Sequence, residues 1–144
     1  MVRRATLKDI EDINKLGKYI TNDFANLFKM EKIFKEDFAK VFVYEEKGKI
    51  VGFIHVTELY EVVDIVNIVI HPKRRNKGFA SVLIDYIISD AGSLVQMVML
   101  EVATDNEAAM GLYEKFGFEK VITRSTYYPG KDAYLMRKMV GVYE

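Results

Sequence analysis

The sequence predicts an α/β protein in which helices lie on both faces of a mixed β-sheet. Segments with hydrophobic residues at helical spacing interleave with segments in which such residues alternate or run together. Half of the 144 residues are hydrophobic and 29% are charged, which is the composition of a globular protein with a proper core. We expect a single domain over residues 1–144, because no repeat, low-complexity tract or Pro/Gly-rich linker divides the chain.

The first third of the chain predicts a short strand and two helices. Residues 2–5 predict the strand, and Thr6 followed by Asp9 predicts a helix start, since an acid three residues after the cap favours it. The apolar positions of this helix follow at helical spacing: Leu7, Ile10, Ile13, Leu16 and Ile20. A second, weaker helix is predicted over residues 23–40, with an apolar side of Phe24, Leu27, Phe28, Phe34 and Phe38.

Three strands are predicted next. Residues 41–46 and 49–58 form a hairpin across Lys47-Gly48, where the glycine supplies a positive φ. Residues 61–71 predict a central strand that is covered on both faces, because both of its faces are apolar. Strict alternation places Val63, Ile65, Asn67 and Val69 on one face and Val66, Ile68 and Ile70 on the other. Pro72 ends the strand.

Two helices and three strands complete the chain. A helix from residue 79 places Phe79, Val82, Leu83, Tyr86 and Ile87 on one side and is ended by Gly92. Residues 95–103 predict a strand. The cap-type residues 104–106 precede a helix with Ala109, Leu112, Tyr113 and Phe116 on one face, which Gly117 ends. Residues 118–127 and 132–139 predict the last two strands, so the predicted order is β-α-α-β-β-β-α-β-α-β-β.

Composition excludes several classes of function. Lys plus Arg and Asp plus Glu both number 21, so no net charge recruits nucleic acid or an acidic membrane. The absence of cysteine excludes disulfides, thiolate metal sites and an acyl-cysteine mechanism. No apolar run approaches the ~18 residues of a membrane span, and the first residues lack an apolar signal core. We therefore expect a cytoplasmic protein that uses no metal and binds neither nucleic acid nor membrane.

The basic loop of residues 73–78 is the strongest candidate site. It joins a buried strand to a helix N-terminus, where free N–H groups, the helix dipole and nearby Arg and Lys favour a phosphate or diphosphate. Gly78 and Ala80 allow the backbone to approach the anion closely. The Walker and dinucleotide motifs do not match, because Phe79 follows Gly78 and the further glycines are missing. The residues alone also allow a solvated basic turn.

The spacing Arg75-x-x-Gly78-x-Ala80, after an apolar strand and Pro72, resembles a signature of the GNAT superfamily of N-acetyltransferases. Residues 100–106, 108–109 and 112–118 resemble its second signature. Residues 127–136 resemble the ending of the RimI-type subgroup, which acetylates protein N-termini. The resemblance covers roughly residues 51–139. It implies acetyl-coenzyme A as the donor and a GNAT fold: a mostly antiparallel sheet of about seven strands with four helices, and a cleft between splayed central strands.

The resemblance also implies roles for individual residues. The strand residues Ile68, Val69 and Ile70 would offer backbone groups to the pantetheine arm and the thioester. Asn106 would hydrogen-bond the same arm, Glu101 would be the general base and Tyr113 the general acid. The diphosphate would be bound by the loop and the helix start, at Arg75, Asn76, Lys77, Gly78, Phe79, Ala80 and Ser81. Candidates for the walls of the acceptor groove are Tyr127 and Tyr128.

These candidate residues also have structural interpretations. Glu101 alternates with apolar strand neighbours and suits either a cleft or a solvated strand end. Asn106 suits a helix cap as well as a cofactor contact, and Tyr113 lies on the apolar stripe of its helix, as a core tyrosine would. Tyr127 and Tyr128 are equally typical of an edge strand.

Two histidines, Asn76 and residues 20–27 also bear on the interpretation of the site. We interpret His55 and His71 as structural or surface residues. Asn76 stands where a glycine is common in the superfamily, and asparagine tolerates the left-handed conformation. Residues 20–27 lack the Pro-Trp-like element that the subgroup often carries at its acceptor groove.

The expected reaction is direct acetyl transfer in a ternary complex, since no cysteine is present to form an acyl-enzyme. A protein N-terminus is the favoured acceptor, because about 10–15% of an α-amine is neutral at pH 7 against ~0.04% of a lysine. The subgroup's namesake modifies a ribosomal protein, which makes such a protein a candidate partner. Two alternatives stay open: acetylation of a small amine such as a polyamine, and a non-catalytic acyl-coenzyme A sensor. The sequence allows a monomer or a homodimer.

Overall fold

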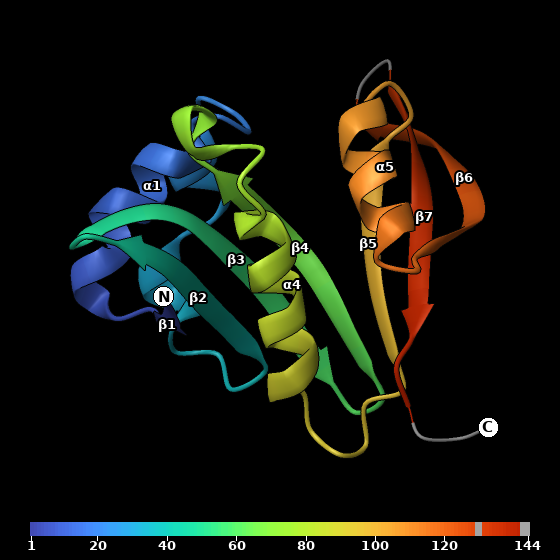
Figure 1. Cartoon of the computed structure of the whole chain (residues 1–144), viewed down its shortest axis with the longest axis horizontal. Helices are drawn as coiled ribbons and strands as arrows, with labels where there is room; N and C mark the ends of the chain where they lie inside the picture. The colour runs from blue at the N-terminus through green and yellow to red at the C-terminus, as the bar shows by residue number, and fades with distance from the viewer. Residues whose placement is uncertain (129–130, 142–144) are drawn as a thin grey trace.

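The computed structural model describes the backbone of residues 1–128 and 131–141, and the side chains of residues 1–125 and 132–141. Its described residues form a seven-stranded sheet in the order β1-β2-β3-β4-β5-β7-β6 (Figure 1). Only the β4–β5 pair in this sheet is parallel. The mixed, mostly antiparallel sheet is therefore confirmed. The strands are β1 (Val2–Arg4), β2 (Ala39–Glu46), β3 (Lys49–Leu59), β4 (Val62–Ile70), β5 (Met97–Ala103), β6 (Glu119–Tyr128) and β7 (Lys131–Met139).

Helices pack on both faces of the sheet and create two cores. The helices are η1 (Leu7–Asp9), α1 (Ile10–Gly17), α2 (Phe24–Leu27), α3 (Met30–Ile33), η2 (Pro72–Arg74), α4 (Phe79–Asp90) and α5 (Glu107–Lys115). Residues of α1, α2 and α3 pack with β2, β3 and β4 in the smaller core. The larger core joins α4 and α5 to the other face (Figure 1).

The predicted helix over residues 23–40 is wrong. The segment instead forms the single turns α2 and α3, and its last two residues already belong to β2. Leu27 is 61% exposed and Phe38 is 39% exposed, so only part of the expected apolar side is buried. The spacing of the phenylalanines matched a helical period over too few residues for the pattern to distinguish one helix from two turns.

The predicted faces of α1 and α4 need correction as well. Leu7 and Ile20 are exposed, because the first lies in the 3-10 turn η1 and the helix has ended before the second. On α4 the buried residues are Leu83, Ile84 and Ile87. Val82 and Tyr86 lie at the edge of the contact with the sheet and are 43% and 38% exposed.

A β-bulge overturns the predicted alternation in β4. The pairing with β3 changes from His55–Asn67 to Val56–Ile65, so Val66 is an extra residue with no partner opposite it. After the bulge, Ile68 and Ile70 pack in the larger core, the one that already holds Val63 and Ile65. Asn67 and Val69 consequently turn towards the other face, where Val69 joins the smaller core. A strict two-residue period cannot detect such an insertion.

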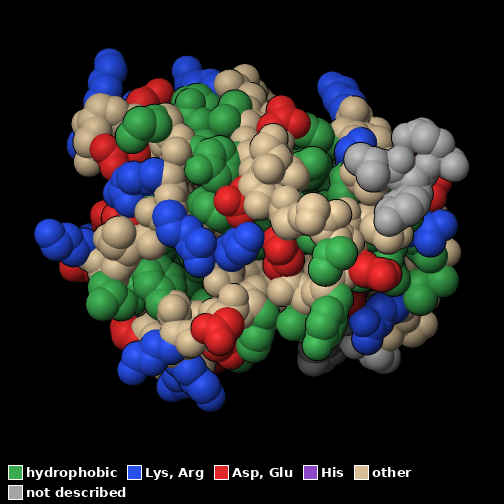
Figure 2. Space-filling model, turned by 90° about the horizontal axis from the view of Figure 1, so that it is seen from below, with side chains coloured by type: hydrophobic (Ala, Val, Ile, Leu, Met, Phe, Trp, Pro, Cys, Tyr) green, Lys and Arg blue, Asp and Glu red, His purple; other side chains and the backbone are tan. Residues whose placement is uncertain are grey.

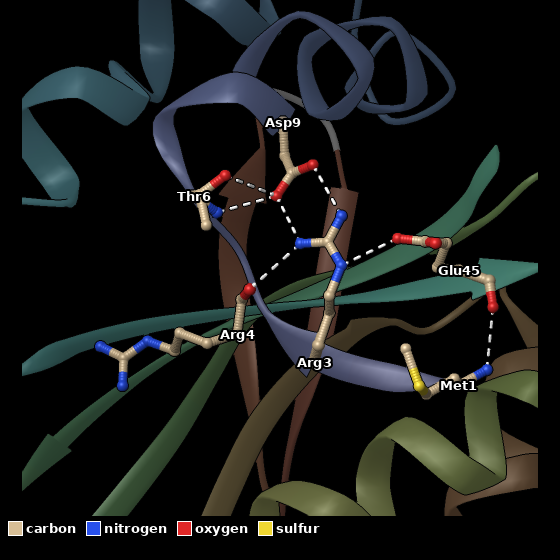
Figure 3. A network of polar contacts seen from close by, with 6 residues as sticks. All are labelled: Met1, Arg3, Arg4, Thr6, Asp9 and Glu45. Carbon is tan, nitrogen blue, oxygen red and sulfur yellow. Dashed lines mark hydrogen bonds and ion pairs between the residues drawn. The ribbon is translucent and has the colours of Figure 1, made fainter. Parts of the chain in front are cut away.

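A partly buried ion-pair network holds the first strand to the first helix (Figure 3). The Arg3 guanidinium donates to both carboxylate oxygens of Asp9, at 2.8 and 3.0 Å, and to Glu45 at 2.8 Å. Asp9 also accepts from the backbone N–H of Thr6 at 2.8 Å, which confirms the predicted helix start. The Arg3 hydrogen bond is the largest cause that lowers the pKa of Asp9, and it opposes the effect of burial.

Charged side chains of both signs are interspersed with apolar ones on the face that Figure 2 shows. This face includes the end of the molecule where α4 leads into β5 (Figure 1). No large area of one sign appears on it, as the equal numbers of acidic and basic residues predict.

Candidate functional site

The central strands of the sheet separate and leave a cavity between them. The parallel pairing of β4 with β5 ends at Ile65 and Leu100, although the strands continue to Ile70 and Ala103. A cavity of about 640 Å³ opens where the two strands diverge. Its walls also include the loop after β4, the start of α4 and one side of α5. The splayed strands that the sequence resemblance implied are therefore present.

Most of the predicted site residues lie on this one cavity. Twelve of them line it: Ile68, Val69, Ile70, Arg75, Asn76, Gly78, Phe79, Ala80, Ser81, Glu101, Asn106 and Tyr113. Lys77 is exposed in the same loop but is not among the lining residues. Tyr127 and Tyr128 belong to β6, and their side chains lie outside the described part of the structure.

The loop before α4 has the backbone conformation that an anion site needs. Asn76 and Gly78 both have positive φ, at 63° and 81°, so asparagine does adopt the left-handed conformation here. Gly78 is the N-cap of α4 and supplies no side-chain acceptor. The first N–H groups of this twelve-residue helix therefore remain available to a ligand, and the helix dipole favours an anion there.

Open space surrounds the cap. A Cβ built on Gly78 would meet no heavy atom within 4 Å, so glycine is required here for its positive φ. The open space at Gly78 and the uncapped helix start are compatible with an anion such as a diphosphate at this end of the cavity.

Several basic and aromatic groups of the loop are already engaged in holding its shape. The Arg75 Nε donates to the carbonyl oxygen of Ile70 at 3.0 Å, and Arg74 forms an ion pair with Glu46 at 2.8 Å. The His71 Nδ1 accepts from the backbone N–H of Lys73 at 3.1 Å. These contacts fix the path of the chain from β4 to α4. The backbone N–H groups at the start of α4 take no part in these contacts.

Glu101 lies in β5 with its side chain directed away from the larger core. Its neighbours Leu100 and Val102 are buried in that core, so strand alternation places Glu101 on the opposite face. One carboxylate oxygen, Oε1, accepts a hydrogen bond from Arg124 Nη1 at 2.7 Å. The other, Oε2, is buried and has no hydrogen-bond partner among the described residues.

Tyr113 approaches the cavity from the other face of the sheet. It lies on α5, is 7% exposed and packs edge-on against Phe118 with 5.9 Å between ring centroids. Burial raises the pKa of its hydroxyl to about 12. The hydroxyl is therefore protonated at physiological pH and can donate its hydrogen to a partner in the cavity. The direction of this shift is opposite to the lowered pKa that a stronger acid would need.

Asn106 satisfies the capping interpretation and still faces the cavity. Its Oδ1 accepts from the backbone N–H of Ala109 at 3.2 Å and so caps α5. The amide nitrogen Nδ2, a donor only, is not used in this cap. One side chain can thus serve both of the roles that the sequence left open.

Two lining features escaped the sequence interpretation. Tyr19 and Ile20, which follow α1, reach the cavity, and the Tyr19 hydroxyl lies 3.5 Å from His71 Nε2. Asn67 also lines it and is held from behind by His55, whose Nδ1 lies 3.5 Å from Asn67 Nδ2. The bulge at Val66 turns Asn67 to this side, and no local pattern in the sequence signals it.

Within the described residues, no group of three or more His, Cys, Asp or Glu side chains is arranged to hold a metal ion. No helix among them is long and apolar enough to cross a membrane.

The comparison with protein families finds one matching model, described as the acetyltransferase (GNAT) family, over residues 7–118. The chain is 34% identical over 100 residues to the N-alpha-acetyltransferase RimI of Mycobacterium tuberculosis, which covers 65% of this chain and 62% of the relative. It is 29% identical over 92 residues to the [ribosomal protein bS18]-alanine N-acetyltransferase of Escherichia coli K12, covering 63% and 62%. The matches span between 26% and 62% of the length of such curated relatives.

Solved structures share the whole fold. Ard1 from Thermoplasma volcanium superposes with a TM-score of 0.84 at 27% identity, over 97% of both chains. The likeness therefore includes β6 and β7, which lie beyond the family match.

Proposed function

The chain belongs to the acetyltransferase (GNAT) family, and from this premise we propose that it transfers the acetyl group of acetyl-coenzyme A directly to the α-amine of a protein N-terminus. One observation carries the proposal. A single cavity brings together an uncapped helix N-terminus, a carboxylate oxygen that has no partner among the described residues, and a protonated tyrosine. Transfer from a diphosphate-bearing thioester to an amine requires an anion site, a group that accepts a proton and a group that donates a hydrogen bond.

The two proposed catalytic side chains work from opposite faces of the splayed sheet. Glu101 faces the side that carries α1. We propose that it accepts the proton of the attacking amine, either directly or through a water molecule. Tyr113 faces the side of α4 and α5, where the diphosphate site lies. Amine and thioester would thus enter from different sides and meet between β4 and β5.

The reaction in this proposal has a simple balance. The amine nitrogen forms a bond to the acetyl carbon, the carbon–sulfur bond breaks, and the proton lost by nitrogen goes to Glu101. A backbone N–H of the diverging strand, at Val69 or Ile70, would stabilise the negative charge that develops on the acetyl oxygen.

Tyr113 is assigned to the leaving sulfur as a hydrogen-bond donor. A thiol has a pKa near 8.5, so full proton transfer from a hydroxyl with a pKa of about 12 would be uphill by about 5 kcal/mol. Tyr113 therefore acts while the carbon–sulfur bond is breaking, when partial charge on sulfur strengthens the hydrogen bond, and solvent supplies the final proton.

The α-amine is favoured as the acceptor on chemical grounds and by the relatives. A modest carboxylate base suffices for an amine of which about 10–15% is already neutral at pH 7. One curated relative is named an N-alpha-acetyltransferase, and another is named a ribosomal protein alanine N-acetyltransferase. The name of the Escherichia coli relative makes a ribosomal protein a candidate acceptor.

Mass spectrometry of acceptor mixtures tests the proposal. The purified protein is incubated with acetyl-coenzyme A and with peptides that have a free N-terminus, matched peptides with a blocked N-terminus and one internal lysine, and a panel of polyamines. We expect acetylation of the free α-amines alone. The Tyr113→Phe variant should bind acetyl-coenzyme A in calorimetry with unchanged affinity and lose about 10²-fold in kcat.

The other outcomes separate the alternatives. Acetylation of polyamines alone would reject the proposed acceptor and leave the family assignment intact. Binding without any transfer would identify an acyl-coenzyme A sensor. Absence of binding would refute the whole assignment of the cavity.

A further inference from the structure

A cation in the middle of a non-adjacent strand forms an ion pair with the proposed base. Arg124 lies in β6, which is separated from β5 by β7, yet its Nη1 lies 2.7 Å from Glu101 Oε1. In the sheet register Arg124 and Ala103 both lie opposite Ala133, so Arg124 is on the face of Glu101. Ala133, with its single methyl group, leaves room for the arginine side chain to cross β7.

The two oxygens of the Glu101 carboxylate have different surroundings. Arg124 engages Oε1, whereas Oε2 is buried and has no donor among the described residues. Glu101 also lines the cavity. A bond to one oxygen therefore fixes the plane of the carboxylate and leaves the other free for a proton from the acceptor. A glutamate without such an anchor would sample several side-chain rotamers.

A second carboxylate, Asp64, lies on the same face of the sheet as Glu101. Asp64 in β4 lies opposite Met99, two residues before Glu101 on the same face. Burial and then the negative charge of Glu101 raise the pKa of Asp64. The two acidic side chains thus repel each other across the diverging strands. The cation of Arg124 draws Glu101 towards β7 and offsets that repulsion.

We propose that Arg124 is a positioning residue that acts through Glu101, holding the carboxylate so that Oε2 faces the acceptor amine. The inference rests on the proposed function, since it gives Arg124 a role in the same transfer. It extends the site to β6, so that a strand whose described residues lie outside the cavity wall contributes to proton removal.

A double-mutant cycle tests the inference. Arg124→Ala should lower kcat about tenfold while KM for acetyl-coenzyme A stays unchanged, because Arg124 lies outside the diphosphate site. Glu101→Gln should lower kcat by about 10²-fold. If Arg124 acts through Glu101, the double variant should be no slower than Glu101→Gln within about twofold. Arg124→Lys, which keeps the charge, should recover most of the activity.

The hairpin of β6 and β7 offers a matched control. Arg137 in β7 forms an ion pair with Glu119 at 3.4 Å, and neither residue lines the cavity. Arg137→Ala should leave kcat unchanged. A loss of kcat in Arg137→Ala as large as that in Arg124→Ala would refute the positioning role. A double variant whose loss equals the product of the two single losses would refute it as well. Neither result would affect the proposed function. A wild-type protein that transfers no acetyl group would refute the proposed function and this inference with it.

Discussion

At the scale of single residues, burial governs the behaviour of the polar groups that support the site. His55 is 4% exposed, touches the ring of Phe28 edge-on and supports Asn67 at the back of the cavity. Burial lowers its pKa to about 4, because a charged imidazole would lose its hydration there. The folded protein therefore carries a neutral His55 at physiological pH, which agrees with its interpretation as a structural residue.

This burial predicts acid sensitivity with a defined window. The unfolded chain binds a proton at His55 below pH 6.5, while the folded chain resists protonation until about pH 4. The contribution of His55 to the free energy of unfolding is thus fully present above pH 6.5. It falls by about 3 kcal/mol as the pH drops from 6.5 to 4. Urea unfolding at pH 7, 5.5 and 4.5 measures the loss.

His55→Asn is the matched variant, because it keeps a polar atom near the position of Nδ1 and cannot titrate. It should be less stable at pH 7, since the rest of the ring leaves a cavity. Its stability should change less than that of the wild type between pH 6.5 and 4.5. An equally steep dependence in both proteins would contradict the assignment to His55. Asp9 contributes separately, because its lowered pKa removes stability only at pH values below the ordinary range of a carboxyl group.

At the scale of elements, the end of α1 shows why a helix ends where it does. A Cβ at Gly17 would overlap the ring of Phe24, which is fully buried. The close approach allows the chain to turn from α1 into α2 over a few residues. The same turn brings Tyr19 and Ile20 to the cavity, so the glycine places part of the cavity wall.

Two glycine substitutions should therefore have opposite effects on stability. Gly17→Ala should destabilise the fold by about 1–3 kcal/mol, because the added methyl group displaces Phe24. Gly111→Ala should stabilise it by about 0.5–1 kcal/mol, since Gly111 lies within α5 and a Cβ there meets nothing within 4 Å. Thermal unfolding of both variants measures the difference. If Gly17→Ala stabilised the fold as much as Gly111→Ala does, helix propensity would outweigh the packing of Phe24.

At the scale of the whole molecule, the sheet has two halves joined by a short seam. The seam is the parallel pairing of Val62–Ile65 with Met97–Leu100, and beyond it the strands diverge around the cavity (Figure 1). A ligand in the cavity would contact β4, β5 and both flanking helices. Binding should therefore stabilise the molecule as a whole.

Coenzyme A should raise the melting temperature by roughly 5–10 °C at a concentration 100-fold above its Kd. Binding to the folded state alone contributes about 2.7 kcal/mol at this concentration. Pantetheine, which lacks the diphosphate, should give a much smaller shift at the same concentration. Equal shifts from both compounds would show that the loop before α4 does not bind the diphosphate.

Most of the fold was predictable because its signals are local. The alternation of strands and helices, the turn at Lys47-Gly48 and the cap of α5 each depend on residues within a few positions of one another. The faces of β4 after Val66 and the split of residues 23–40 were not predictable, because a bulge and two short turns leave no periodic trace. The loop before α4 was recognisable from its own residues, and twelve predicted positions do line one cavity.

The sequence by itself determined the α/β class, the family signatures and the loop with its left-handed Asn76 and Gly78, since backbone preferences and helix caps act over one or two turns. The tertiary structure alone decided how the side chains meet. Glu101 and Arg124 are 23 residues apart, and β7 lies between their strands. Their contact depends on strand order and register, which follow from how the whole sheet buries its two faces.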